Sequence, residues 1–178
     1  MGDSSHIRRA SRRMEIAFKI VFILIPVINA LVWLFINGIS DEMQKNILPH
    51  YVRLPLPAQA RLLGFIVSML PAGITMYGTW AVVRLFRLYE KGQIFREANV
   101  HCFRDISRAL IIWCVVRLIS DPLMSIALTL HHPPGQRMLS LGLRSMDITA
   151  LLVGFALAVI AWVMEEGRKL QEELDLTV

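Results

Sequence analysis

The chain has 178 residues, of which 55% are hydrophobic and only 19% are charged, and its mean hydropathy is +0.53. Soluble domains carry less apolar and more charged sequence, so this composition indicates a membrane protein rather than a soluble enzyme or binding domain. The net charge of +5 would suit a nucleic acid, but no basic face interleaved with aromatic residues is present. We therefore expect no direct nucleic-acid binding.

Four long apolar runs follow one another along the chain, and each comes close to the roughly 20 residues that a helix needs to cross a bilayer. We predict an all-α, polytopic membrane protein, a four-transmembrane-helix bundle that forms a single integral membrane domain over residues 1–178. The lipid bilayer is its first expected partner. The predicted helices cover about residues 16–37, 62–86, 106–130 and 147–166, with short tails at both ends.

Basic residues indicate the orientation of these spans. If the N-terminus is inside, thirteen Lys and Arg residues lie in the inner segments and five lie in the outer loops. Positively charged residues are enriched on the cytoplasmic side of membrane proteins. The sequence therefore predicts a multi-pass protein whose N-terminus and C-terminus are both cytoplasmic.

The third apolar run contains two charged residues, Arg117 and Asp121, near its middle. They lie four positions apart and so on one helical face, where the guanidinium can reach the carboxylate. An arginine without a partner at mid-membrane costs at least about 2.5 kcal/mol. We therefore expect an ion pair between them.

Ser120, Asp121 and Pro122 together resemble a helix N-cap followed by proline at the first helical position. This pattern predicts that the third helix is kinked or broken at this depth, which membranes tolerate only inside protein or beside water. Asn29 in the first span is a candidate third member of this intramembrane polar site. The site is either a structural ion pair in a kinked helix or a small polar cavity that binds a molecule, an ion or a lipid.

The second and fourth spans end in similar segments, "YEKGQIF" and "MEEGRKL". Glycine at a helix C-cap leaves the last carbonyls satisfied, so both glycines are predicted helix ends. The match is also consistent with two tandem helical hairpins. The corresponding positions are Glu90, Gly92 and Phe95 in the first segment and Glu165, Gly167 and Leu170 in the second.

These two segments also suggest a cytoplasmic docking surface. The stretch from Arg84 to Arg108 holds six basic and three acidic residues, and it includes Asn99. In the tail, Leu170 and Leu174 lie at i,i+4 among carboxylates and could pack on a partner helix. The alternative is that the charged residues make only local ion pairs, each contributing less than about 1 kcal/mol if exposed.

The fourth span has small residues at every fourth position, Ala150, Gly154 and Ala158. Such a ladder lets another helix approach closely. The partner is either another helix of the same chain or a second copy in a homodimer, and the sequence favours neither.

The chain shows no motif of a known catalytic or cofactor site. No Ser-His-Asp set, H-E-x-x-H, phosphate loop or pair of catalytic carboxylates is present in the sequence. His50, His131 and His132 have no metal-ligand spacing, and Cys102 and Cys114 match neither a redox nor a zinc pattern. We therefore expect a protein that is not an enzyme and has no metal and no cofactor.

The segment "RLFRLYEKGQIFREANVHCFRDIS" and the ending "GRKLQEELDLTV" resemble the bacterial membrane proteins of domain-of-unknown-function family 2975. The resemblance covers most of the chain from the second span onward, and the first span carries no distinguishing motif. It implies a small four-helix protein of the bacterial inner membrane with no assigned activity. In some relatives the gene neighbours a small helix-turn-helix transcription regulator, which implies a membrane partner for such a regulator.

Two functions follow from these observations. The first is a non-enzymatic regulatory or interaction protein whose cytoplasmic loop and tail bind a partner such as a small helix-turn-helix regulator. The second is a binding or transport-related protein for a small molecule, ion or lipid, with its polar site in the third span. Four helices are few for a monomeric transporter, so we favour the first.

Overall fold

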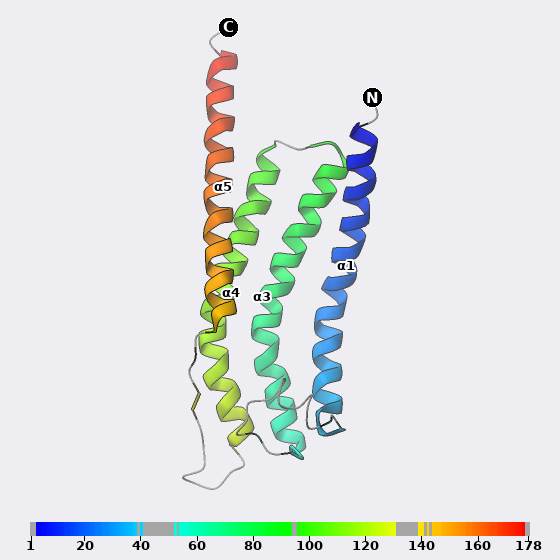
Figure 1. The fold of residues 1–178 in the computed structure, drawn as a ribbon, viewed down its shortest axis with the longest axis vertical. Helices are drawn as coiled ribbons and strands as arrows, with labels where there is room; N and C mark the ends of the chain where they lie inside the picture. The colour runs from blue at the N-terminus through cyan, green and yellow to red at the C-terminus, as the bar shows by residue number, and fades with distance from the viewer. Residues whose placement is uncertain are drawn as a thin grey trace. The chain divides into compact units, whose positions relative to one another are not determined.

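The computed structural model describes residues 3–38, 40, 52, 54–93, 96–130, 139, 140, 142 and 144–176, with side chains described only between residues 8 and 170. All the secondary structure in these ranges is helical (Figure 1). The elements are α1 (Asp3–Phe35), the short 3-10 helix η1 (Ile36–Gly38), α3 (Ala58–Glu90), α4 (Glu97–Thr129) and α5 (Ser145–Leu176). Four of the described helices are long and apolar enough to cross a membrane. The predicted all-α class, with four helices long and apolar enough to cross a membrane, is confirmed.

Each long helix extends further than the apolar run that predicted it. Helices α1, α3 and α4 have 33 residues each and α5 has 32, which is more than the roughly 20 that the hydrocarbon layer requires. The added turns are polar, as in the first turns of α1 and α4 and the last turns of α5. The length of the apolar run predicts the membrane-crossing part of a helix. Helix propensity and ion pairs stabilise the polar turns beyond that part.

The chain forms two compact units. Unit 1 contains Met1–Ile23, Ile74–Cys114 and Arg144–Val178, and unit 2 contains Leu24–Gly73 and Val115–Leu143. Helices α1, α3 and α4 contribute residues to both units, so the units are not separate segments of the sequence. The segments around Gly92 and Gly167 belong to unit 1. The intramembrane pair Arg117 and Asp121 belongs to unit 2.

The core of unit 2 is built around the end of α1. Trp33 and Ile36 pack with Val52, Leu56, Ala60 and Leu128, all less than a tenth exposed. The side chain of Asn37 bonds both backbone groups of Leu56: Nδ2 donates to the carbonyl at 3.0 Å, and Oδ1 accepts from the amide at 2.8 Å. This pair of hydrogen bonds fixes the chain before α3 against the core.

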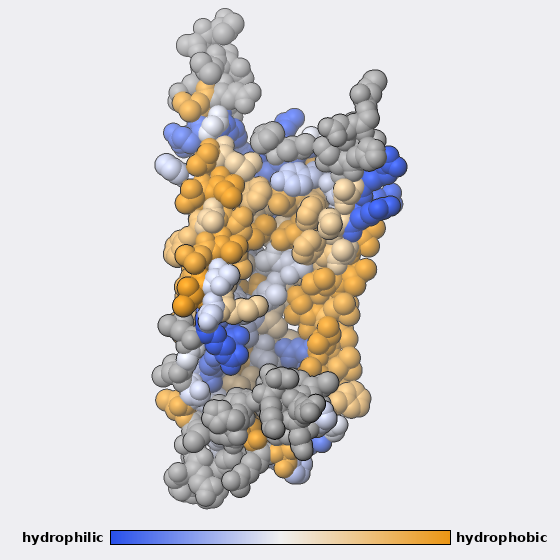
Figure 2. Space-filling view, in the orientation of Figure 1, coloured by the Kyte–Doolittle hydropathy of each residue, from blue (hydrophilic) through white to orange (hydrophobic). Residues whose placement is uncertain are grey.

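Large apolar side chains cover the outer surfaces of the helices. Figure 2 shows hydrophobic residues over the middle parts of α1 and α5 and hydrophilic residues at the start of α1. On α5, Leu152, Phe155 and Trp162 are each more than half exposed. A water-soluble protein would not leave a band of this kind uncovered, whereas a helix in contact with lipid requires it.

Candidate functional site

The connection between α3 and α4 is fixed at its first end by Gly92. Its φ angle is +75°, a left-handed conformation that glycine adopts without steric cost. The amide of Gly92 bonds the carbonyl of Tyr89, and the amide of Gln93 bonds the carbonyl of Leu88, both at 3.0 Å. This pair of bonds is the Schellman motif, which ends a helix and satisfies its last carbonyls. The predicted helix cap at Gly92 is confirmed.

The other end of this connection is fixed by Asn99, which is completely buried. Its Nδ2 donates to the carbonyl oxygen of Gln93 at 2.8 Å, so α4 is tied to the residue that follows the cap. We predicted Asn99 as part of a docking surface, but a buried side chain cannot touch a partner. Its side chain instead links the start of α4 to Gln93.

Glu15 joins α1 to α3. Its carboxylate is buried, with Oε1 2.7 Å from Nζ of Lys19 on the same helix and 3.2 Å from Nε of Arg87 on α3. Phe18 stacks on Phe86 one turn further, with ring centroids 5.7 Å apart. Arg87 therefore pairs with Glu15 rather than with its helix neighbour Glu90. Sequence analysis missed Glu15, although an acidic residue at the edge of an apolar span signals a required partner.

Polar bonds also connect α3 to α4 and α4 to α5. Arg84 forms an ion pair with Asp105 across the first contact. Across the second, the hydroxyl of Ser107 donates to the carbonyl oxygen of Gly154 at 2.8 Å. A Cβ added at Gly154 would lie 3.2 Å from Cβ of Leu110, so the glycine allows this close approach. Neighbouring helices of unit 1 are thus held in fixed register.

The small-residue ladder therefore serves a contact within the chain at Gly154. Its flanking members differ, because Ala150 and Ala158 are only partly buried. Ala150 instead lines an apolar groove of about 380 Å³ in unit 1. The homodimer remains a prediction.

Most of the described acidic side chains at this end of unit 1 are buried or half-buried, whereas many of the basic ones are exposed. We define the charged end of unit 1 as the described residues among 8–19, 84–108 and 165–170, which belong to the first turns of α1, the α3–α4 connection and the last turns of α5 (Figure 1). Its exposed acidic residues are Glu97 and Glu166. Its exposed basic residues are Arg8, Arg9, Arg12, Arg13, Lys91, Arg96, Arg108 and Lys169. Within the side chains that the structure describes, the accessible surface of this end is therefore strongly basic.

The second predicted cap, Gly167, is wrong. Helix α5 continues through it to Leu176, because a single glycine costs only about 1 kcal/mol in a helix and neighbouring ion pairs support it. Arg168 lies 3.2 Å from Glu165, and Lys169 lies 3.7 Å from Glu166. The similarity of the two span ends thus does not extend to their structure.

The predicted tail residues Leu170 and Leu174 therefore lie in the same helix as the fourth span, beyond its apolar part. Leu170 is 56% exposed, as a contact residue for a partner would be. The side chain of Leu174 and the whole of Phe95 lie outside the described residues. Glu90 is half-buried at the last turn of α3.

The intramembrane ion pair is present in unit 2. Nη2 of Arg117 lies 3.4 Å from Oδ2 of Asp121, and both side chains are about a quarter exposed. Asn29 belongs to a different group: its Oδ1 accepts from the hydroxyl of Ser68, which in turn accepts from Nε1 of Trp33 at 2.9 Å. The predicted three-residue site is therefore divided into a pair on α4 and a hydrogen-bonded chain between α1 and α3.

The predicted break at Asp121 is wrong, whereas the alternative, a kink at this depth, stays a prediction. Helix α4 runs from Glu97 to Thr129 with Pro122 inside it. Proline removes one backbone hydrogen bond, and membrane-spanning helices tolerate it where neighbouring groups satisfy the freed carbonyl. Ser125 donates to the carbonyl oxygen of Pro122 at 2.8 Å and strengthens this turn. The polar cavity inferred from a broken helix loses its main support.

No group of three or more potential metal ligands occurs among the residues that the structure describes. His50, His131 and His132 lie outside them. Cys114 is buried and bonds the carbonyl oxygen of Asp147 at 3.2 Å, where it serves packing between α4 and α5.

Comparison with known protein families identifies the same family that the segments after the second and fourth spans resemble. Residues 24–178 match the family described as "Protein of unknown function (DUF2975)". No curated protein and no solved structure matches the chain. The family match begins within the first span, and it includes the Gly92 cap, Asn99, the Arg117 and Asp121 pair and the whole of α5. The chain therefore belongs to the DUF2975 family.

Proposed function

We propose that this chain is a non-enzymatic regulatory protein of the bacterial inner membrane whose charged end holds a cytoplasmic partner protein. The excess of Lys and Arg in the segments that include the charged end supports an orientation with both termini in the cytoplasm. The partner class we propose is a small helix-turn-helix transcription regulator, as the family resemblance implies.

The observation that carries the proposal is that both ends of the α3–α4 connection are fixed. Membrane orientation needs basic residues at this end, but it does not need them on a rigid frame. Here Gly92 ends α3 in a set conformation, and the buried Asn99 ties α4 back to Gln93 at 2.8 Å. A surface that is preorganised loses less conformational freedom when a partner binds. Lys91 and Arg96 are exposed on this frame.

The charge of this surface indicates the chemistry of the partner. Among the side chains that the structure describes at this end, eight exposed basic residues against two acidic ones favour an acidic face on the bound protein. Charge complementarity of this kind accelerates association and is weakened by salt, because exposed charges are screened beyond about 8 Å at physiological ionic strength. The interaction should therefore be lost at high salt.

The last turns of α5 supply the second part of the surface. They belong to the same unit as the α3–α4 connection and continue as a helix beyond Gly167 (Figure 1). Leu170 is exposed there among charged residues. An amphipathic helix end of this type can pack on an apolar groove of a partner.

Co-purification from the native membrane tests the proposal. The tagged chain is extracted in mild detergent at low salt, and the proteins that accompany it are identified and quantified by mass spectrometry. We expect one stoichiometric cytosolic regulator, which is lost when the chain is truncated after Glu166 and retained after Arg144→Gln, a charge change outside the charged end. A partner equally abundant with the truncated chain, or none at all, would overturn the proposal.

Ligand binding at Arg117 and Asp121 is the weaker candidate, because α4 is continuous there. One observation still favours it: the hydroxyl oxygen of Ser120, next to Asp121, is buried without a hydrogen-bond partner among the described residues. If only a small molecule accompanied the purified chain, and Asp121→Asn abolished its binding, this candidate would replace the first.

A further inference from the structure

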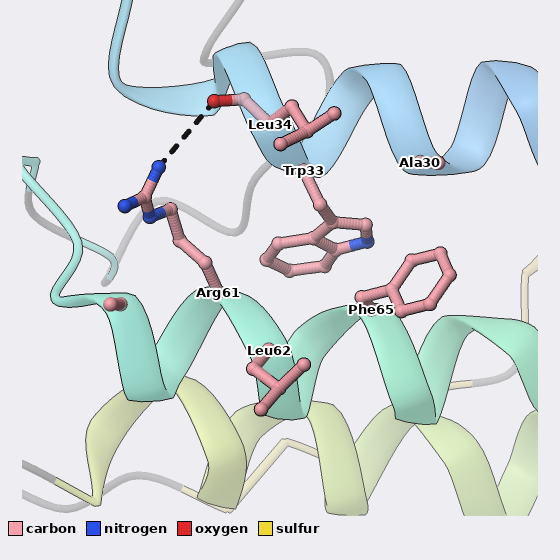
Figure 3. A pocket seen from close by; sticks show the side chains of 7 residues that line it. Ala30, Trp33, Leu34, Arg61, Leu62 and Phe65 are labelled. Carbon is pink, nitrogen blue, oxygen red and sulfur yellow. Dashed lines mark hydrogen bonds between the residues drawn. The ribbon is translucent and has the colours of Figure 1, made fainter.

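A pocket in unit 2 lies between the end of α1 and the start of α3. Its volume is about 320 Å³, within the range of roughly 300–1,000 Å³ that small-molecule sites occupy. The apolar part of its wall is formed by Ala30, Leu34, Leu62, Phe65 and the ring of Trp33 (Figure 3). Ala58 and one charged residue, Arg61, complete the lining.

The guanidinium of Arg61 has unused hydrogen-bonding capacity. Of its five N–H donors, one on Nη1 reaches the carbonyl oxygen of Leu34 at 3.4 Å, the dashed line of Figure 3. Its Nε is buried and has no acceptor among the described residues. Within this part of the chain no carboxylate forms an ion pair with Arg61. The pocket therefore carries a net positive charge at one side and an apolar wall on the others.

The pocket is held open by a rigid wall. Nε1 of Trp33 donates to the hydroxyl of Ser68 at 2.9 Å, and Ser68 bonds Oδ1 of Asn29 at 2.8 Å. The indole lies against Gly64, where an added Cβ would be 2.0 Å from its Cη2 atom. The large ring therefore has one position, and its indole nitrogen is already satisfied. A ligand finds a preformed apolar surface beside Arg61.

The position of Arg61 along the chain places it at the depth of lipid headgroups. It immediately precedes the uncharged run from Leu62 to Val83, which fills the hydrocarbon layer when α3 crosses the bilayer. An arginine at the end of such a run lies at the membrane interface, among phosphate groups. The apolar wall then faces the acyl chains.

We propose that this pocket binds an anionic phospholipid, whose phosphate accepts hydrogen bonds from Arg61 while one acyl chain lies along Trp33, Leu62 and Phe65. The planar fork of a guanidinium matches a phosphate in two parallel bonds. The uncompensated charge favours an anionic headgroup over a zwitterionic one. This site is separate from the charged end of unit 1 and does not depend on the function proposed there.

Quenching by brominated lipids locates the bound molecule. The full chain, with Trp80, Trp113 and Trp162 replaced by phenylalanine so that only Trp33 fluoresces, is reconstituted with phosphatidylcholine and increasing brominated phosphatidylglycerol. We expect quenching of Trp33 to show at least about a fivefold preference for the anionic lipid, the factor that one interfacial cation supplies. Arg61→Gln should abolish the preference, and the matched change Arg144→Gln should retain it.

A second variant tests the pocket itself. Ala30→Phe fills the apolar wall without changing charge, so it should remove the preferential quenching while leaving Arg61 in place. Circular dichroism and thermal unfolding establish that each variant is folded. Equal quenching by brominated phosphatidylcholine and phosphatidylglycerol in the parent chain, or a preference that survives Arg61→Gln in a folded protein, would overturn the proposal.

Discussion

Replacing Gly64 by alanine is expected to destabilise the contact between α1 and α3 in unit 2, because no space exists for a methyl group. A Cβ at this position would lie 2.0 Å from Cη2 and 2.3 Å from Cζ3 of Trp33. The indole would have to move, and its hydrogen bond of 2.9 Å to Ser68 would be strained or lost.

The magnitude follows from three contributions. Overpacking a close contact costs about 1–3 kcal/mol, and loss of the Trp33 hydrogen bond adds about 0.5–1.5 kcal/mol. The better helix propensity of alanine returns up to about 1 kcal/mol. We therefore expect Gly64→Ala to lower the free energy of unfolding by about 0.5–3.5 kcal/mol. In the same helix Gly73 has nothing within 4 Å of an added Cβ, so Gly73→Ala should be neutral or slightly stabilising.

Unfolding in mixed micelles with increasing sodium dodecyl sulfate, followed by circular dichroism, measures both variants. A second background sharpens the test. The three closest atoms all belong to the benzo ring of Trp33, which a phenylalanine side chain does not reach. Gly64→Ala should therefore cost much less in a Trp33→Phe chain, and this difference is the coupling energy of the two positions. Equal stability of Gly64→Ala and Gly73→Ala, or the same cost in both backgrounds, would refute the reasoning.

Two further predictions use the same unfolding measurement. Gly92→Ala should destabilise the chain by about 1–2 kcal/mol because its φ is +75°, whereas Gly167→Ala, inside α5, should be neutral or stabilising; effects of the same sign would contradict the assigned cap. Asp121→Asn should destabilise by about 1–3 kcal/mol because it removes the carboxylate from Arg117. If the pair is structural, adding Arg117→Gln should recover most of the lost stability. A double variant no more stable than Asp121→Asn alone would contradict a structural role for the pair.

Much of the fold could be predicted from the sequence because membrane insertion imposes a length rule. Uncharged runs near the roughly 20 residues of a span identify the helices without any knowledge of their contacts. The polar turns of α1 beyond the N-terminal edge of the predicted span, by contrast, belong to the same continuous helix from Asp3. Hydropathy cannot detect these turns, because it identifies only the apolar part of a helix that lies in the hydrocarbon layer.

The candidate sites were predictable only where the signal is local. Arg117 and Asp121 are four residues apart, so their pairing follows from helical spacing. Gly92 and Gly167 have the same local sequence pattern but opposite outcomes, because a cap also depends on residues beyond the glycine: Asn99 secures the turn after Gly92, whereas α5 simply continues past Gly167. The long-range pair of Glu15 and Arg87, 72 positions apart, has no local signal of its partner.

The most direct test of the central proposal is photocrosslinking in living cells at two exposed positions. A photoreactive amino acid replaces Lys91, beside the Gly92 cap on the charged end, or Leu139, which is 64% exposed in unit 2. We predict that the chain labelled at Lys91 crosslinks one cytosolic regulator, that truncation after Glu166 reduces this product, and that the chain labelled at Leu139 does not form it. No protein crosslink at Lys91, or the same product from both positions, would contradict a partner held by the charged end.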